Sequence, residues 1–211
     1  MAGIFLSGHP LDHYRFEQKH YNTSTIADFL EFRDQINQHS NPNRPFRLLA
    51  LVTDAQHRIA KNGNKYGNFV IEDYTGKLDF PLFSEDYLRF TPLLQTGTII
   101  LVLGFLKQRY NRSEYEFKLQ QVMLGESVKK TLTRELTIVA HPGSLKPEWI
   151  EFLNKNRKKN PGKTSLVFHL IDPEAKQQVT LRTLEKPLEM NDELLQFLAD
   201  RQEWQIRVQS L

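Results

Sequence analysis

The middle of the chain alternates hydrophobic and polar residues in the way that half-buried strands do. This pattern predicts strands over residues 46–59, 65–73, 77–83, 98–110 and 114–124. The stretch SEDYLRFTPLLQ at 84–95 instead indicates a short helix, with acidic residues in its first turn. Three strands, a helix and two further strands follow the order of a five-stranded OB-fold barrel. We therefore expect an OB-fold domain over residues 46–125.

Hydrophobic residues at helical spacing precede this domain. Thr25 and Asp28 have the positions of a capping box, and Ile26 and Phe29 follow as the start of an apolar stripe. The segment HSNPNRP that comes next contains two prolines and cannot continue a helix. Residues 1–45 are therefore predicted to form a turn, a short helix and a linker.

The last part of the chain has a different order of elements. Strand-like stretches at 135–141, 164–172, 177–184 and 203–209 enclose helical stretches at 147–159 and 192–201. Asn191 stands before the second helical stretch as a candidate cap. The β-α-β-β-α-β order predicts a small sandwich of the split βαβ, ferredoxin-like type over residues 126–211. The predicted fold class is therefore mixed β and α+β, an OB-fold barrel followed by this sandwich.

Composition narrows the classes of protein to which the chain can belong. Its 211 residues are 39% hydrophobic and 25% charged and include no cysteine, which excludes disulfides and thiolate chemistry. No apolar run approaches the roughly 18 residues of a membrane span. The first residues lack the pattern of a secretory signal. We therefore expect a cytoplasmic protein without a membrane partner.

The sequence also lacks the common motifs of catalysis and cofactor binding. Its seven histidines show no HExxH or comparable metal spacing, and there is no P-loop, GxGxxG or GxSxG. Glu72 and Asp73 are adjacent carboxylates, but neighbouring strand residues point to opposite faces. A turn at the end of a strand explains this pair better than a metal clamp does. We therefore expect no bound cofactor, no metal and no active site in this chain.

Basic residues concentrate at two places in the predicted barrel. Six of its ten lysines and arginines lie in the acid-free stretches 56–68 and 104–113, which include the loops between strands 1 and 2 and between strands 4 and 5. In OB folds these loops flank the groove for oligonucleotides, where cations neutralise phosphates and aromatic rings stack on bases. The predicted nucleic-acid-binding residues are Arg58, Lys61, Lys65, Tyr66, Asn68, Lys107, Arg109, Tyr110 and Arg112. Alternatively, these cations are solvated hairpin tips and both tyrosines cover the end of the barrel.

Several motifs resemble the C-terminal region of bacterial replicative DNA polymerase III alpha subunits. They are the turn LSGHPL at 6–11, the loop KNG at 61–63, and then Phe69, Asp73, Gly76 and Phe83. The resemblance implies an OB fold that holds single-stranded template DNA, and a terminal domain that docks the clamp-loader subunit tau in some lineages. It also implies that the metal-binding aspartates of the parent enzyme, a DNA-directed DNA polymerase, lie elsewhere in that protein.

The leading interpretation is therefore a non-catalytic fragment of a replicative polymerase. Its OB domain would bind single-stranded DNA without sequence specificity, and its terminal domain would dock a replisome subunit such as tau. Two alternatives remain open, a pure protein-interaction module without DNA affinity and the OB appendage of an RNA-binding enzyme. The segment SGHPLD is expected to be a structural turn set by Gly8 and Pro10 and packed by Leu11, in preference to a DNA contact.

Overall fold

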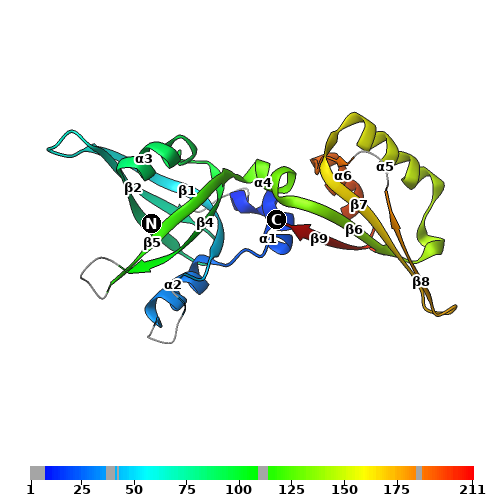
Figure 1. The fold of residues 1–211 in the computed structure, drawn as a ribbon. Helices are drawn as coiled ribbons and strands as arrows, with labels where there is room; N and C mark the ends of the chain where they lie inside the picture. The colour runs from blue at the N-terminus through cyan, green and yellow to red at the C-terminus, as the bar shows by residue number, and fades with distance from the viewer. Residues whose placement is uncertain (1–7, 37–40, 42, 109–113, 184–186) are drawn as a thin grey trace. The chain divides into compact units, whose positions relative to one another are not determined.

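The computed structural model describes residues 8–36, 41, 43–108, 114–183 and 187–211. The chain divides into two compact units, residues 1–126 and 127–211 (Figure 1). The first unit contains the short helices η1 (Pro10–Tyr14), α1 (Arg15–His20) and α2 (Ile26–Asp34), the strands β1 (Phe46–Ile59), β2 (Lys65–Glu72) and β3 (Lys77–Phe83), the helices α3 (Ser84–Phe90) and η2 (Thr91–Leu93), and the strands β4 (Ile99–Gln108) and β5 (Tyr115–Leu124).

The five strands form one antiparallel sheet in the order β3-β2-β1-β4-β5. This order, with α3 between β3 and β4, confirms the expected OB-fold arrangement. β1 serves both halves of the sheet, because Phe46–Leu51 pair with β4 and Leu51–Ile59 pair with β2. A shift of register between Val52 and Asp54 separates the two halves. The second half of β1 and β2 together form an arm that carries the loop 60–64 (Figure 1).

The interior of this unit is rich in aromatic rings. Phe69, Phe80 and Phe117 come from β2, β3 and β5 and are at most 8% exposed. Phe29 of α2 packs edge-on against Phe117, with ring centroids 4.9 Å apart. The capping box at Thr25 is present and begins α2 as predicted. The N-terminal helix is therefore part of the barrel core.

The second unit contains most of α4 (Gly125–Leu132), followed by β6 (Thr133–Ala140), η3 (Pro142–Ser144), α5 (Pro147–Lys159), β7 (Pro161–Asp172), β8 (Gln177–Arg182), α6 (Asp192–Ala199) and β9 (Gln205–Ser210). The predicted β-α-β-β-α-β order is confirmed. The expected split βαβ pairing is wrong, because β6 and β7 are direct parallel neighbours in the order β8-β7-β6-β9. A helical crossover can return the chain to the next strand position or to the one beyond. Both topologies give the same element order, so the sequence pattern does not distinguish them.

The two longer helices of the second unit pack against each other. Phe152 of α5 and Phe197 of α6 stack with their ring centroids 3.8 Å apart. Trp149 and Trp204 make an edge-on contact beside them at 5.1 Å. None of the helices in the described ranges is long and apolar enough to cross a membrane.

Candidate nucleic-acid interface

Three residues from three strands line up on the outer face of the arm. Tyr66 of β2 lies directly opposite Arg58 of β1 on one side and Phe83 of β3 on the other. The rings of Tyr66 and Phe83 are nearly parallel, with an interplanar angle of 16° and a centroid distance of 5.8 Å. Phe83 is 57% exposed, which is unusual for so large an apolar side chain. The arm therefore presents a guanidinium and two aromatic rings side by side.

The alternation of β2 and β3 explains why these rings face outwards. Gly67, Phe69 and Ile71 are buried, so the intervening residues of β2 face out. On β3, Leu78, Phe80 and Leu82 fill the interior and Phe83 has the outward parity. Sequence reasoning selected Tyr66 by this rule but overlooked Phe83. The sequence did show that Phe83 faces outwards, because it lies an even number of residues from the polar Asp79 on the same strand.

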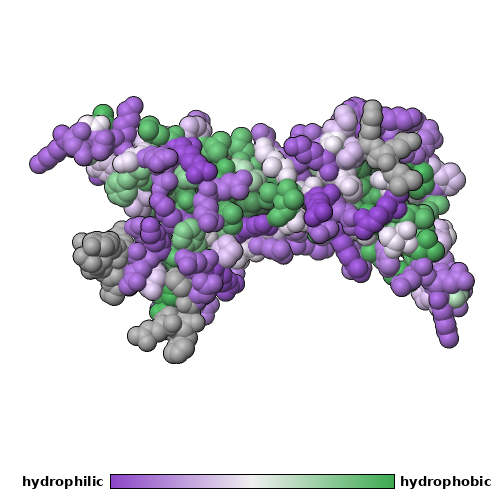
Figure 2. Space-filling model, in the orientation of Figure 1, coloured by the Kyte–Doolittle hydropathy of each residue, from purple (hydrophilic) through white to green (hydrophobic). Residues whose placement is uncertain are grey.

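The loop end of the arm is cationic. Lys61 and Lys65 are exposed, and within the described residues neither has a carboxylate at ion-pair distance. Gly63 turns the chain with φ at +81°, a value that favours glycine. The tip of the arm is covered by hydrophilic residues (Figure 2). Flexible ammonium groups of this kind are suited to tracking phosphates.

The outer face changes sign away from the loop. Arg58 donates to Gln56 at 3.1 Å, and Gln56 donates in turn to Asp54 at 2.9 Å. Asp54 lies opposite Val70 on β2, which lies opposite Asp79 on β3. Two carboxylates thus flank the middle of the face. The charges of this face therefore favour a polyanion at the loop end over the middle.

The structure places the remaining predicted residues in two groups. Asn68 lies on the outer face of β2 next to the Tyr66 position, opposite Gln56 and Pro81. Lys107 is exposed on β4, which pairs with the other half of β1, and it lies opposite Glu116. The predicted residues Arg109, Tyr110 and Arg112 lie outside the described residues. The arm therefore brings together Arg58, Lys61, Lys65, Tyr66 and Asn68, and Lys107 stands on a separate strand.

Comparison with known families agrees with the architecture. Residues 47–124 match the family described as OB-fold nucleic acid binding domain, and residues 136–209 match the family described as DNA polymerase III alpha subunit, C-terminal domain. The chain is similar to the C-terminal region of the DNA polymerase III alpha subunit. The resemblance seen in the sequence motifs is thus confirmed.

Curated alpha subunits match along most of the chain. The protein of Pseudomonas aeruginosa is 23% identical over 199 residues, which are 94% of this chain and 16% of that protein. The protein of Pseudomonas fluorescens is 24% identical over 82% of this chain and 14% of its own length. The protein of Aquifex aeolicus is 26% identical over 65% of this chain and 11% of its own. The chain spans less than a fifth of each of these alpha subunits.

Two solved structures of replication protein A also match. The second OB-fold domain of the Methanococcus maripaludis protein is 24% identical over 39% of this chain and 85% of that domain, with a TM-score of 0.28. A replication protein A heterotrimer bound to single-stranded DNA is 14% identical over 71% of this chain and 36% of its own, with a TM-score of 0.31. The OB-fold assignment rests on the strand order and on the family match.

Several of the alpha-subunit motif residues have structural roles. Asp73 is 8% exposed, and one of its oxygens accepts from the Ile26 amide at 2.7 Å. The other oxygen accepts from Thr75 and from the Gly76 amide in the turn between β2 and β3. This confirms the prediction that the Glu72–Asp73 pair belongs to a turn. In the described part of the chain no three acidic or histidine side chains are grouped to hold a metal.

The described part of the SGHPLD segment, residues 8–12, is a turn, as expected. His9 caps η1 by accepting from the Leu11 amide at 3.1 Å, and Leu11 is fully buried. Asp12 accepts from the His9 amide at 2.9 Å and from the Tyr74 hydroxyl at 2.8 Å. The Tyr74 hydroxyl, Arg15 and the His9 amide hold the pKa of Asp12 below its usual value. Burial and the Asp12 contact raise the pKa of Tyr74 to about 12.

Proposed function

We propose that the first unit binds single-stranded DNA without sequence specificity, as the template-holding part of a polymerase III alpha subunit. The observation that carries this proposal is the row formed by Arg58, Tyr66 and Phe83 beside the cationic loop. Bases would stack on the exposed Phe83 ring and the half-buried Tyr66 ring, because every base has a π-face and stacking contributes about 1–3 kcal/mol per base. Neither ring interaction reads a base edge, so the sequence of the strand would matter little.

The charge pattern supports a path across the arm. Phosphates would lie against Arg58, Lys61 and Lys65, because the carboxylates of Asp54 and Asp79 repel them from the middle of the face. The strand would therefore cross the loop end of β1, β2 and β3. Lys107 and the basic residues Arg109 and Arg112, with Tyr110, are proposed to continue this path from the loop between β4 and β5.

Salt dependence of binding tests the electrostatic part. If about four phosphates are neutralised, the plot of log K against log salt should have a slope near −3 for single strands. Lys61→Gln should make the slope shallower by about 0.7, because one phosphate contact is lost. Lys77→Gln is the matched control, since Lys77 pairs with Glu72 at 2.9 Å, away from the loop. Equal effects of the two variants, measured by fluorescence anisotropy, would contradict the path.

For the second unit we propose docking of a replisome subunit such as clamp-loader tau, beside the rest of the polymerase chain. Two exposed apolar side chains support a docking role. Val179 and Leu181 of β8 are 51% and 49% exposed. They lie opposite Leu170 and Phe168 of β7, so four apolar residues adjoin on one face of the hairpin.

Titration of tau by calorimetry tests this docking. Leu181→Glu should weaken binding, since a charge would replace an apolar contact, whereas Gln178→Glu on the opposite face of β8 should leave it unchanged. Unchanged affinity in Leu181→Glu would remove the hairpin from the docking surface.

We also propose that the chain contributes no polymerase chemistry of its own and works in the cytoplasm as part of a larger enzyme. The support is its match to the C-terminal domain family and to less than a fifth of each related alpha subunit. A primer-extension assay on the isolated chain tests the first statement. Incorporation of nucleotides that persists through purification would contradict it.

A further inference from the structure

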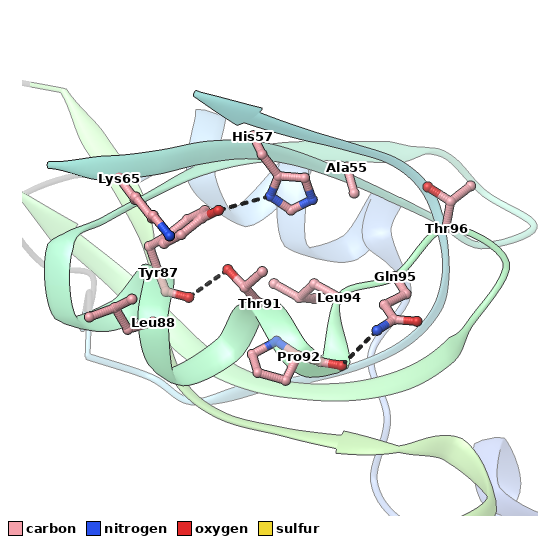
Figure 3. A pocket seen from close by; sticks show the side chains of 10 residues that line it. All are labelled: Ala55, His57, Lys65, Tyr87, Leu88, Thr91, Pro92, Leu94, Gln95 and Thr96. Atoms are coloured by element: carbon pink, nitrogen blue, oxygen red, sulfur yellow. Dashed lines mark hydrogen bonds between the residues drawn. The ribbon is translucent and has the colours of Figure 1, made fainter. Parts of the chain in front are cut away.

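A cleft lies on the other side of the arm, between β1 and β2 and the helices α3 and η2 (Figure 3). Its volume is about 570 Å³, within the usual range for small-molecule pockets of about 300–1,000 Å³. The cleft belongs entirely to the first unit. Of the residues in the path proposed above, only Lys65 also lines this cleft.

The floor of the cleft is apolar. Leu94 is 1% exposed and Tyr87 is 8% exposed, so both are fixed parts of the core that show one side to the cleft. Ala55 contributes a small side chain from β1, which leaves room above the floor. Pro92 and the 67% exposed Leu88 stand at the helix side. Such a surface suits a flat group with an apolar face.

Polar groups converge on the same space. His57 Nδ1 and the Tyr87 hydroxyl are hydrogen-bonded at 3.1 Å, which orients the imidazole (Figure 3). Lys65 reaches in from the first residue of β2, and Gln95 and Thr96 stand at the opposite end. None of the ten lining residues is acidic. The cleft therefore favours an anionic group beside an apolar one.

Lys65 links the cleft to the outer face. Lys65 and Tyr66 are consecutive residues of β2, so they point to opposite sides of the arm. Their backbones are only about 3.3 Å apart along the strand. A phosphate at Lys65 would therefore lie within one or two nucleotides of a base on Tyr66.

We propose that this cleft holds one nucleotide unit, with the base over the apolar floor against the exposed Leu88 and Pro92, and the phosphate at Lys65 and His57. The proposal rests on the single-stranded DNA binding proposed above, because the bound strand would then contact both sides of the arm. The nucleotide in the cleft would be held more firmly than its neighbours, since residues of β1, β2, α3 and η2 contact it and its neighbours lie on an open face.

Nuclear magnetic resonance of the full 211-residue chain with 5′-dAMP tests the proposal. Amide shifts are expected at Ala55, Leu88 and Thr96. Inorganic phosphate should shift only residues near Lys65 and His57, and deoxyadenosine should bind more weakly than 5′-dAMP. Shifts by phosphate equal to those by 5′-dAMP would show an anion site without a base. Shifts confined to Tyr66 and Phe83 would overturn the proposal that the cleft binds the nucleotide.

Variants that fill the cleft separate this proposal from the function on which it rests. Thr96 lines the cleft and is exposed, so Thr96→Trp should fill the cleft without disturbing the core. Gln120→Trp is the matched control, because Gln120 is an exposed residue of β5 that does not line the cleft. Thr96→Trp should lower the affinity for an oligonucleotide about tenfold, and Gln120→Trp should leave it unchanged. Lys65→Gln is a second variant that leaves the floor intact, and it should abolish the shifts caused by phosphate.

The outcomes are distinguishable. One outcome is that an oligonucleotide binds both tryptophan variants equally but fails to bind Tyr66→Ala. That result would overturn the proposed nucleotide site in the cleft and leave the proposed function standing. Binding of 5′-dAMP in the cleft without any binding of oligonucleotides would overturn the proposed function and leave a nucleotide site. Binding of neither ligand would overturn both.

Discussion

Asp73 joins two segments that lie 47 residues apart in the sequence. Its carboxylate accepts a hydrogen bond from the first amide of α2. It also accepts hydrogen bonds from the amides of Thr75 and Gly76 in the turn after β2. Asp73→Ala should lower the free energy of unfolding by about 2–4 kcal/mol, because several donors lose their acceptor in a buried place. Asp79→Ala is the control, because Asp79 is exposed on β3. This substitution should change the free energy of unfolding by less than about 0.5 kcal/mol. Chemical denaturation measures both, and equal losses would contradict the role of Asp73.

The contact between Tyr74 and Asp12 predicts two pH dependences. The pKa of Tyr74 is raised to about 12, so its contribution to stability is fully present below pH 10 and is lost as the pH rises towards 12. The pKa of Asp12 is lowered, so its contribution is present above the usual aspartate pKa and is lost as the pH falls through the lowered value. Denaturation of the native chain and of Tyr74→Phe across pH should show a difference that shrinks at both extremes. A constant difference would contradict the contact.

The strands and helices could largely be predicted from the sequence, and the strand pairing of the second unit could not. Alternation and caps are local signals, so Thr25 and Asn191 were predicted as caps and are caps in the structure. The pairing of β6 with β7 depends on packing between distant segments, which one sequence does not encode locally. The outward position of Phe83 could be read from the alternation of its strand, but its place beside Tyr66 depends on the register between β2 and β3.

The cap of α6 supplies a prediction for the second unit. Asn191 accepts from the Leu194 amide at 2.9 Å and exchanges two amide hydrogen bonds with Asn156, which is 3% exposed. Asn191→Ala should therefore lower the free energy of unfolding of this unit by about 1–2 kcal/mol. Asn154→Ala, on the exposed side of α5, should have an effect below about 0.5 kcal/mol. Melting of the second unit, followed by tryptophan fluorescence, reports both; an unchanged melting temperature in Asn191→Ala would contradict the cap.

For the whole molecule, the two compact units suggest a division of tasks. Both tryptophans, Trp149 and Trp204, lie in the second unit, and the arm with its rings and cations lies in the first. The net charge of +3 says little about this division, because it averages a cationic loop with acidic stretches elsewhere. The overall division was visible in the sequence as a change of pattern. The sharper finding is that Tyr66, Phe83 and the cations Arg58, Lys61 and Lys65 gather at the loop end of the arm.

The affinity of the chain for an unstructured oligonucleotide, measured by fluorescence anisotropy at low salt, tests the proposed DNA binding most directly. The native chain should bind, and Tyr66→Ala combined with Phe83→Ala should weaken binding by at least about tenfold for every base composition. The double variant should keep the native circular dichroism, because neither ring belongs to the buried core. No binding by the native chain, or equal binding by the double variant, would contradict the account.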